Sequence, residues 1–137
     1  MTEIATDPII INRTAVQVFD FLSDLGNYKN LMPEDQVSDF VSTGDSATLQ
    51  VKGLGAFEIK ITNTIPHEHI RIVPNGKLPF KFDIEWLLTE DDTRCRVIGK
   101  INAELNMFIR MVAEPKLRGF VDGQAYKLKN YLEQEIH

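Results

Sequence analysis

Two histidines separated by one residue are the first candidates for chemistry in this sequence. His67 and His69 flank Glu68 directly after Pro66. If they lay on a strand, both imidazoles would project from one face and could hold a metal ion, which commonly takes nitrogen ligands. No third ligand is evident at a matching spacing. The pattern therefore favours a solvated turn, and we predict no metal site.

The other reactive side chains also lack the pattern of a catalytic centre. Asp20, Asp24, Glu34 and Asp35 cluster in a segment of predicted short helices, where such charges ordinarily face water. Signatures of a serine nucleophile, a zinc protease or a phosphate loop are missing from the sequence. Cys95 is the single cysteine, which excludes an internal disulfide and a multi-cysteine zinc site. We predict no catalytic residue and no cofactor.

Length and composition indicate an ordinary globular chain. Its 137 residues, 43% of them hydrophobic, predict a single domain over residues 1–137 that buries about two thirds of its unfolded surface. The net charge of −5 and the scattered Lys and Arg residues argue against nucleic acid as a partner. Apolar runs stay well short of the roughly 18 residues that a membrane span needs, and the N-terminus lacks the pattern of a secretory signal. We therefore expect a cytoplasmic location.

Period-2 alternation of apolar and polar residues dominates the middle of the chain. It is clearest from Phe80 to Leu88, where alternate residues are apolar and one face of the strand is predicted to be buried. Turn residues separate six predicted strands, at Val37–Thr43, Ala47–Lys52, Ala56–Thr64, His69–Val73, Phe80–Thr89 and Arg94–Leu105. A further strand is predicted from Thr2 to about Ile11, bent at Asp7-Pro8 because proline cannot donate to a strand ladder.

Helical patterns flank this antiparallel sheet. Two short helices are predicted after the first strand, at Ala15–Leu22 and Leu25–Leu31. In the last quarter we expect a piece from Met107 to Ala113, a break or sharp kink before Pro115, and a long helix to about Glu135. The fold class is therefore α+β, with a curved antiparallel sheet of about seven strands wrapped around a long C-terminal helix.

The first predicted helix carries a family resemblance. The run Val18-Phe19-Asp20-Phe21-Leu22-Ser23-Asp24-Leu25-Gly26-Asn27-Tyr28, followed by Leu31-Met32-Pro33, resembles the START-like or SRPBCC superfamily, as does the aromatic strand that ends at Trp86. The resemblance extends over the chain from Ile4 to Ile136 and implies the helix-grip fold. Members of this superfamily include lipid-transfer proteins, coenzyme-Q-binding proteins and polyketide cyclase/dehydrase-like proteins, so the resemblance is specific for fold and weak for function.

The inward faces of sheet and helix contain the candidate ligand-binding residues. The cavity-forming fold implies a pocket between the sheet and the C-terminal helix, with space left by Gly99, Ala103 and Ala125. A filled core explains the same apolar faces nearly as well, because burial of each large side chain is itself favourable. The predicted lining residues are Phe57, Ile59, Phe82, Ile84, Trp86, Val97, Phe108, Met111, Phe120, Val121 and Gln124.

Polar and flexible groups near this space leave several alternatives open. Gln124 falls on the apolar helix face and needs a partner, which is either a strand carbonyl, a trapped water or a ligand group. Arg110 and Glu114 form either an ordinary ion pair one turn apart or a latch on a ligand headgroup. The apolar group from Met107 to Val112 is either a lid over the pocket mouth or simple packing.

Three functions are compatible with these patterns. The first is a carrier or sensor that binds an apolar or amphipathic small molecule. The second is an enzyme of the polyketide cyclase or dehydratase kind, and the third is a protein-interaction module with a filled core. A homodimer remains open in each case.

Overall fold

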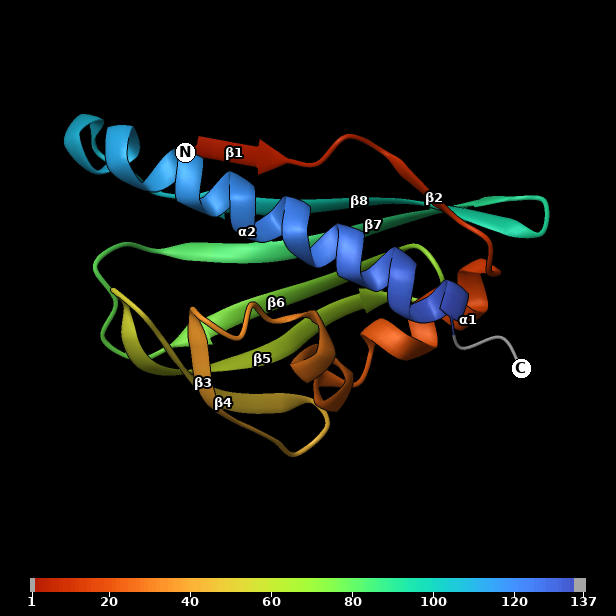
Figure 1. Cartoon of the computed structure of the whole chain (residues 1–137), viewed down its shortest axis with the longest axis horizontal. Coiled ribbons are helices and arrows are strands. Elements are labelled where there is room, and N and C mark those ends of the chain that lie inside the picture. The colour runs from red at the N-terminus through yellow and green to blue at the C-terminus, as the bar shows by residue number, and fades with distance from the viewer. Residues whose placement is uncertain (1, 135–137) are drawn as a thin grey trace.

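The computed structural model describes residues 2–134 and shows one antiparallel sheet with a long helix laid across one face (Figure 1). The strand order is β1-β8-β7-β6-β5-β4-β3, so consecutive strands from β3 to β8 are neighbours and form a meander. The strands are β1 (Thr2–Ala5), β2 (Ile9–Ile11), β3 (Val37–Ser42), β4 (Ser46–Val51), β5 (Gly55–Ile65), β6 (His69–Asn75), β7 (Phe82–Asp91) and β8 (Arg94–Ala103). The predicted α+β helix-grip architecture is confirmed.

The described sheet has eight strands where about seven were predicted, because the N-terminal strand is divided. β1 pairs with one half of β8 and β2 with the other half. Between them lies the bend at Asp7-Pro8, where proline has no N–H to offer to the ladder. Thr6 keeps the chain on β8 through this bend: its backbone N–H donates to the Gly99 carbonyl at 2.8 Å, and its Oγ1 accepts from the Gly99 N–H at 3.1 Å.

Two short helices follow β2 as predicted. Helix α1 (Ala15–Leu22) begins with a capping box: the Thr14 Oγ1 accepts from the Gln17 N–H at 3.2 Å, and the Gln17 Oε1 accepts from the Thr14 N–H at 3.0 Å. The 3-10 helix η1 (Leu25–Leu31) is capped by Asp24, whose carboxylate accepts from the Gly26 N–H. Helix η1 packs against the long helix and, with α1, encloses the core at one end of the sheet.

The long helix α2 (Met107–Gln134) runs without interruption through Pro115, so the predicted break into two pieces was wrong. Proline at this position removes the N–H that would bond the Met111 carbonyl. Met111 and Val112 are exposed, so water can solvate the freed carbonyl and the break is avoided. The predicted last helical residue, Glu135, lies outside the described residues.

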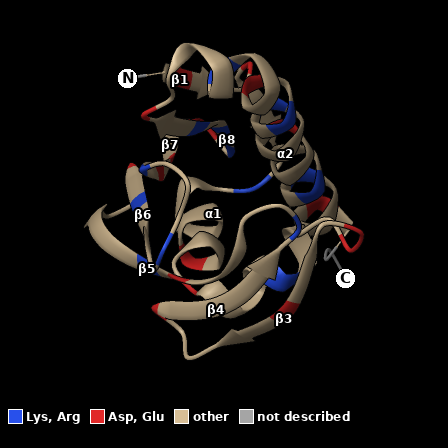
Figure 2. Ribbon diagram, turned by 90° about the vertical axis from the view of Figure 1, so that its left-hand side faces the viewer, with Lys and Arg blue, Asp and Glu red and all other residues tan. Residues whose placement is uncertain are grey.

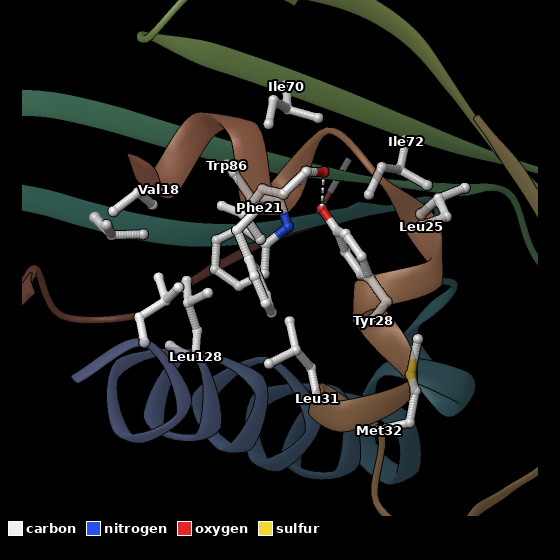
Figure 3. Packing of buried hydrophobic residues seen from close by; sticks show 14 of the residues in the cluster. Val18, Phe21, Leu25, Tyr28, Leu31, Met32, Ile70, Ile72, Trp86 and Leu128 are labelled. Carbon is white, nitrogen blue, oxygen red and sulfur yellow. Dashed lines mark hydrogen bonds between the residues drawn. The ribbon is translucent and has the colours of Figure 1, made fainter. Parts of the chain in front are cut away.

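The core lies between α2, α1, η1 and the inner face of the sheet (Figure 3). Alternation along the strands turns the predicted apolar residues inward, and the predicted inward faces are confirmed. The inward residues that are buried are Leu49, Phe57, Ile59, Ile70, Ile72, Trp86, Leu88, Cys95, Val97, Ile101 and Ala103. From α2 they meet Val121, Ala125, Leu128 and Leu132, which recur at helical spacing.

Candidate functional site

The middle of the sheet–α2 interface is closed. Trp86 and Val121 are completely buried. Gly99 is the cross-strand partner of Trp86, and the indole lies over it: a Cβ built on Gly99 would stand 2.9 Å from the Trp86 ring and 3.2 Å from Val121. The prediction that Gly99 leaves space for a ligand was therefore wrong. The missing side chain makes room for the indole instead.

Two polar side chains, Tyr28 and Gln124, share this closed region with Trp86. The Tyr28 hydroxyl donates to the Leu22 carbonyl at 2.8 Å (Figure 3), and burial raises the pKa of Tyr28 far above its usual range. The Trp86 Nε1 points toward this hydroxyl but does not meet hydrogen-bond geometry with any described residue. Gln124 donates from its Nε2 to the Met32 sulfur at 3.5 Å, rather than to a strand carbonyl. Because burial raises the pKa of Tyr28, its phenol is protonated at neutral pH.

The end of the interface beside the first half of α2 is open. Phe57 and Phe82 meet edge to face with their ring centroids 6.1 Å apart, and Phe80 lies 5.8 Å from Phe82. Phe82 and Ile84 are inward residues of β7, yet both remain only half-buried, as does Phe120 of α2. The inner face thus presents a half-buried apolar surface at this end. We call Phe80, Phe82, Ile84 and Phe120 the open end; beside them, Phe57 and the β8 residues Ile101 and Ala103 are buried.

The structure divides the predicted lining residues into three groups. Six lie in the buried interior: Phe57, Ile59, Trp86, Val97, Val121 and Gln124. Three are half-buried at the open end: Phe82, Ile84 and Phe120. Two, Phe108 and Met111, are exposed and lie outside the interface.

The phase of α2 explains why Phe108 and Met111 do not face the sheet. Its buried residues recur at three- and four-residue steps from Val121 to Leu132. Carried back through an unbroken helix, this period reaches Glu114 and Arg110 rather than Phe108 and Met111. Arg110 and Glu114 form an ion pair there at 3.0 Å, one turn apart, which is the ordinary alternative for these two residues.

The best-formed pockets of the described chain lie away from the sheet–α2 interface. One, of about 280 Å³, is open, and its lining residues are Glu34, Asp35, Gln36, Val37, Ser38, Gln50 and Lys52. The other, of about 400 Å³, lies between the start of α1, the turn between β5 and β6, and the second half of β7. It is lined by Ala15, Val16, Pro66, His67, Glu68, Leu88, Thr89 and Glu90. Neither pocket contains a predicted lining residue.

The two histidines have separate environments. His67 adopts a positive φ of 66° in the turn between β5 and β6, and its ring meets Phe19 edge to face at 5.5 Å. His69 is on β6, where its Nε2 lies 2.9 Å from a Glu85 carboxylate oxygen. Among residues 2–134, no group of three His, Cys, Asp or Glu side chains is arranged to hold a metal ion.

His69 belongs to a polar network on the outer face of the sheet. Asp83, which is buried, accepts from Arg71 at 2.6 Å and from the Asn102 amide at 2.7 Å. The same amide donates to Glu85 at 2.8 Å. Alternation along β7 therefore places carboxylates outside and Phe82 and Ile84 inside, and the network holds the outer side of the open end.

Glu85 is the most strongly perturbed carboxylate of this network. Its burial opposes ionisation, but hydrogen bonds from Asn102, His69 and Lys100 outweigh that effect and lower the pKa of Glu85 to about 2. The Lys100 ammonium lies 3.2 Å from the carboxylate. Glu85 is thus an anion at neutral pH, committed to structural partners on the face opposite α2.

Sequence reasoning left three side chains of the interface out of the candidate site. Tyr28 lies in η1, and Met32 is the residue that ends this helix. Both belong to the motif that carries the family resemblance, so the sequence contained a signal for them. Phe80 was recognised as inward from the alternation but was not included among the lining residues. Its contact with Phe82 places it at the open end.

Residues 2–133 match the family model described as polyketide cyclase / dehydrase and lipid transport. The chain belongs to this family. The resemblance to the SRPBCC helix-grip superfamily is thereby confirmed over nearly the whole chain. No curated protein matches the chain in sequence.

Solved structures share the fold at low sequence identity. The Aha1 dimer from Colwellia psychrerythraea has a TM-score of 0.74 at 17% identity, with 97% of each chain covered. XoxI from Bacillus cereus has a TM-score of 0.74 at 14% identity, with 100% of each chain covered. The di-domain ARO/CYC BexL, from a biosynthetic pathway, has a TM-score of 0.66 at 13% identity, with 97% of this chain and 47% of BexL covered. Identities this low carry the fold only.

Helix α2 is the longest helix of the described residues, and neither it nor any other described helix is long and apolar enough to cross a membrane.

Proposed function

We propose that this protein binds an apolar or amphipathic small molecule between the sheet and α2, as a carrier or a sensor. The observation that carries the proposal is the open end. Phe82 and Ile84 face inward toward α2 but remain half-buried, although the alternation of β7 is that of a core strand. An apolar ligand bound on this surface would bury the exposed parts of Phe82 and Ile84, and burial of apolar surface is favourable.

The anchoring of α2 supports entry at the open end. The buried residues of this helix begin at Val121 and continue to Leu132, all in its second half. In the first half, Leu117 and Phe120 make only half-buried contacts with the sheet. The first half can therefore move away from β7 while the second half holds the core. Gly119 and Gly123, with their low helix propensity, stand near the boundary between the halves.

Binding is a better-supported proposal than a cyclase or dehydratase reaction, the alternative that the family description suggests. General acid–base catalysis needs a titratable group that faces the ligand with a pKa near the working pH. In the closed core beside Trp86, burial raises the pKa values of Tyr28 and Cys95, which keeps both groups neutral. Asp83, the buried carboxylate among the described residues, is bonded to Arg71 and Asn102 on the outer face.

Titration of the full-length protein with dodecanoic acid and with anilinonaphthalene sulfonate tests the proposal. We expect saturable binding of both probes, and weaker binding in Phe82→Ala and Phe120→Ala. Val41→Ala is the matched control, because Val41 is exposed on β3. Trp86 emission should be blue-shifted before any probe is added, since the indole is completely buried.

Absence of saturable binding for both probes would refute the proposal and leave the interaction-module hypothesis ahead. Unchanged affinity in Phe82→Ala and Phe120→Ala would refute the location at the open end. A cytoplasmic location and a homodimer remain predictions.

A further inference from the structure

The first two turns of α2 expose a compact apolar surface, which we call the α2 tip: Met107, Phe108, Met111 and Val112. Their exposed fractions are 80%, 83%, 75% and 64%. The four residues follow the spacing i, i+1, i+4 and i+5, so they share one side of the helix. Isolated exposed apolar residues are normal, but four large ones on adjacent turns mark an interaction surface.

Among residues 2–134, no part of the fold covers the α2 tip. The first turns of α2 extend past the end of β1, in the light-blue segment of Figure 1. The phase that buries Val121 and Leu128 places Arg110 and Glu114 on the sheet side of these turns. Phe108, Met111 and Val112 therefore point away from the core. Met107 falls on the sheet side but is 80% exposed, because these first turns extend past β1 (Figure 1).

Positive charge borders this surface in an acidic protein. Residues 107–118 contain three cations, Arg110, Lys116 and Arg118, and one carboxylate, Glu114, whereas the whole chain has a net charge of −5. Lys116 and Arg118 are exposed beyond the tip, and basic residues recur along α2 in Figure 2. Arg118 also donates from its Nη1 to the Ala5 carbonyl at 3.2 Å, and its remaining N–H groups face solvent with the Lys116 ammonium. An apolar helix face bordered by Lys and Arg is the composition of helices that lie in the interface of an anionic bilayer.

We propose that the α2 tip docks on the surface of a bilayer that contains anionic lipids. Met107, Phe108, Met111 and Val112 enter the boundary between headgroups and acyl chains, and Lys116 and Arg118 contact lipid phosphates. A bilayer accommodates a narrow convex helix end without a complementary surface. Docking there does not depend on whether the open end binds a ligand.

A second copy of the chain fits the α2 tip less well. A stable protein interface takes about 20–30 residues from each side, and the tip offers four apolar side chains. Two tips in contact would also bring their exposed Lys116 and Arg118 cations together, which opposes association. The charge of the segment instead complements a negative surface.

Flotation of the full-length protein with two kinds of vesicle tests the proposal. One kind is pure phosphatidylcholine, and the other contains equal parts of phosphatidylcholine and phosphatidylglycerol. We expect binding to the anionic vesicles that weakens as salt is added, on the order of tenfold weaker in the double variant Phe108→Ser/Met111→Ser. Lys116→Gln should weaken binding to the anionic vesicles by about fivefold.

Tyr126→Ser is the matched control, because Tyr126 is 67% exposed on the same helix but lies outside the tip. It should bind as the unmodified protein does, and circular dichroism should show that all variants remain folded. The proposal is overturned if the protein floats with neither kind of vesicle, or if the double variant binds unchanged. It is also overturned if light scattering shows a dimer that the double variant converts to monomer, because the tip would then join two copies. Probe titration without vesicles tests ligand binding separately.

Discussion

The two ends of the sheet–α2 interface are built from similar residues but are closed to different degrees. At the sealed end, beside the second half of α2, Leu22, Leu25 and Leu128 are fully buried. At the open end, Phe82 and Phe120 occupy equivalent inward positions and stay half-buried. The difference follows from what covers each end, since α1 and η1 enclose only the part of the core beside the second half of α2. Apolar patterning therefore predicts which face turns inward, but not how completely it is covered.

The largest expected effect separates two leucines of the same helix. Leu128→Ala should lower the free energy of unfolding by about 2–5 kcal/mol, because Leu128 is completely buried and its truncation leaves a cavity. Leu117→Ala should cost only about 1 kcal/mol, because Leu117 is half-buried at the other end. Chemical denaturation of both variants measures the difference. Equal losses would show that the open end is as tightly packed as the sealed end.

Two glycines give the next contrast. Gly99→Ala should destabilise the protein by about 1–3 kcal/mol, because the new Cβ would stand 2.9 Å from the Trp86 ring in a packed core. Gly119→Ala should stabilise it by up to about 1 kcal/mol, because no atom lies within 4 Å of the added Cβ and alanine favours the helix. Thermal unfolding followed by circular dichroism tests both. A tolerated Gly99→Ala would mean that the indole has space to move.

The smallest effect concerns the outer face of the open end. Glu85 has a pKa of about 2 against an ordinary value of 4.5, so its ionised form is favoured by folding. The stabilisation is complete above about pH 4.5 and is lost as pH falls toward 2. Glu85→Gln should therefore cost about 1–2 kcal/mol at neutral pH and weaken the acid dependence of stability.

The control for Glu85→Gln is Glu90→Gln, an exposed carboxylate on the same strand. Urea denaturation at several pH values should show that this control keeps the acid dependence of the unmodified protein. If Glu85→Gln keeps it as well, the network around Glu85 does not hold the outer side of β7.

Much of the fold could be predicted because it depends on local patterns. The alternation from Phe80 to Leu88 predicted the inner face of β7, and helix α1 has the predicted bounds, Ala15–Leu22. The prediction of a break at Pro115 was wrong. The effect of this proline depends on whether water solvates the Met111 carbonyl, which has lost its helical hydrogen bond, and the local sequence does not show this. The resulting phase error placed Phe108 and Met111 among the lining residues, whereas they are exposed.

Local sequence patterns were sufficient to predict the α+β class, the succession of strands and helices, and the inward faces of the strands. These features follow from periodicity and turn chemistry, which act over a few residues. Long-range packing, in contrast, sets two features: Trp86 fills the space beside Gly99, and no part of residues 2–134 covers the α2 tip. The physical reason is that the burial of a side chain depends on neighbours distant in the chain, so apolar residues of the same kind become buried, half-buried or exposed according to what lies opposite them.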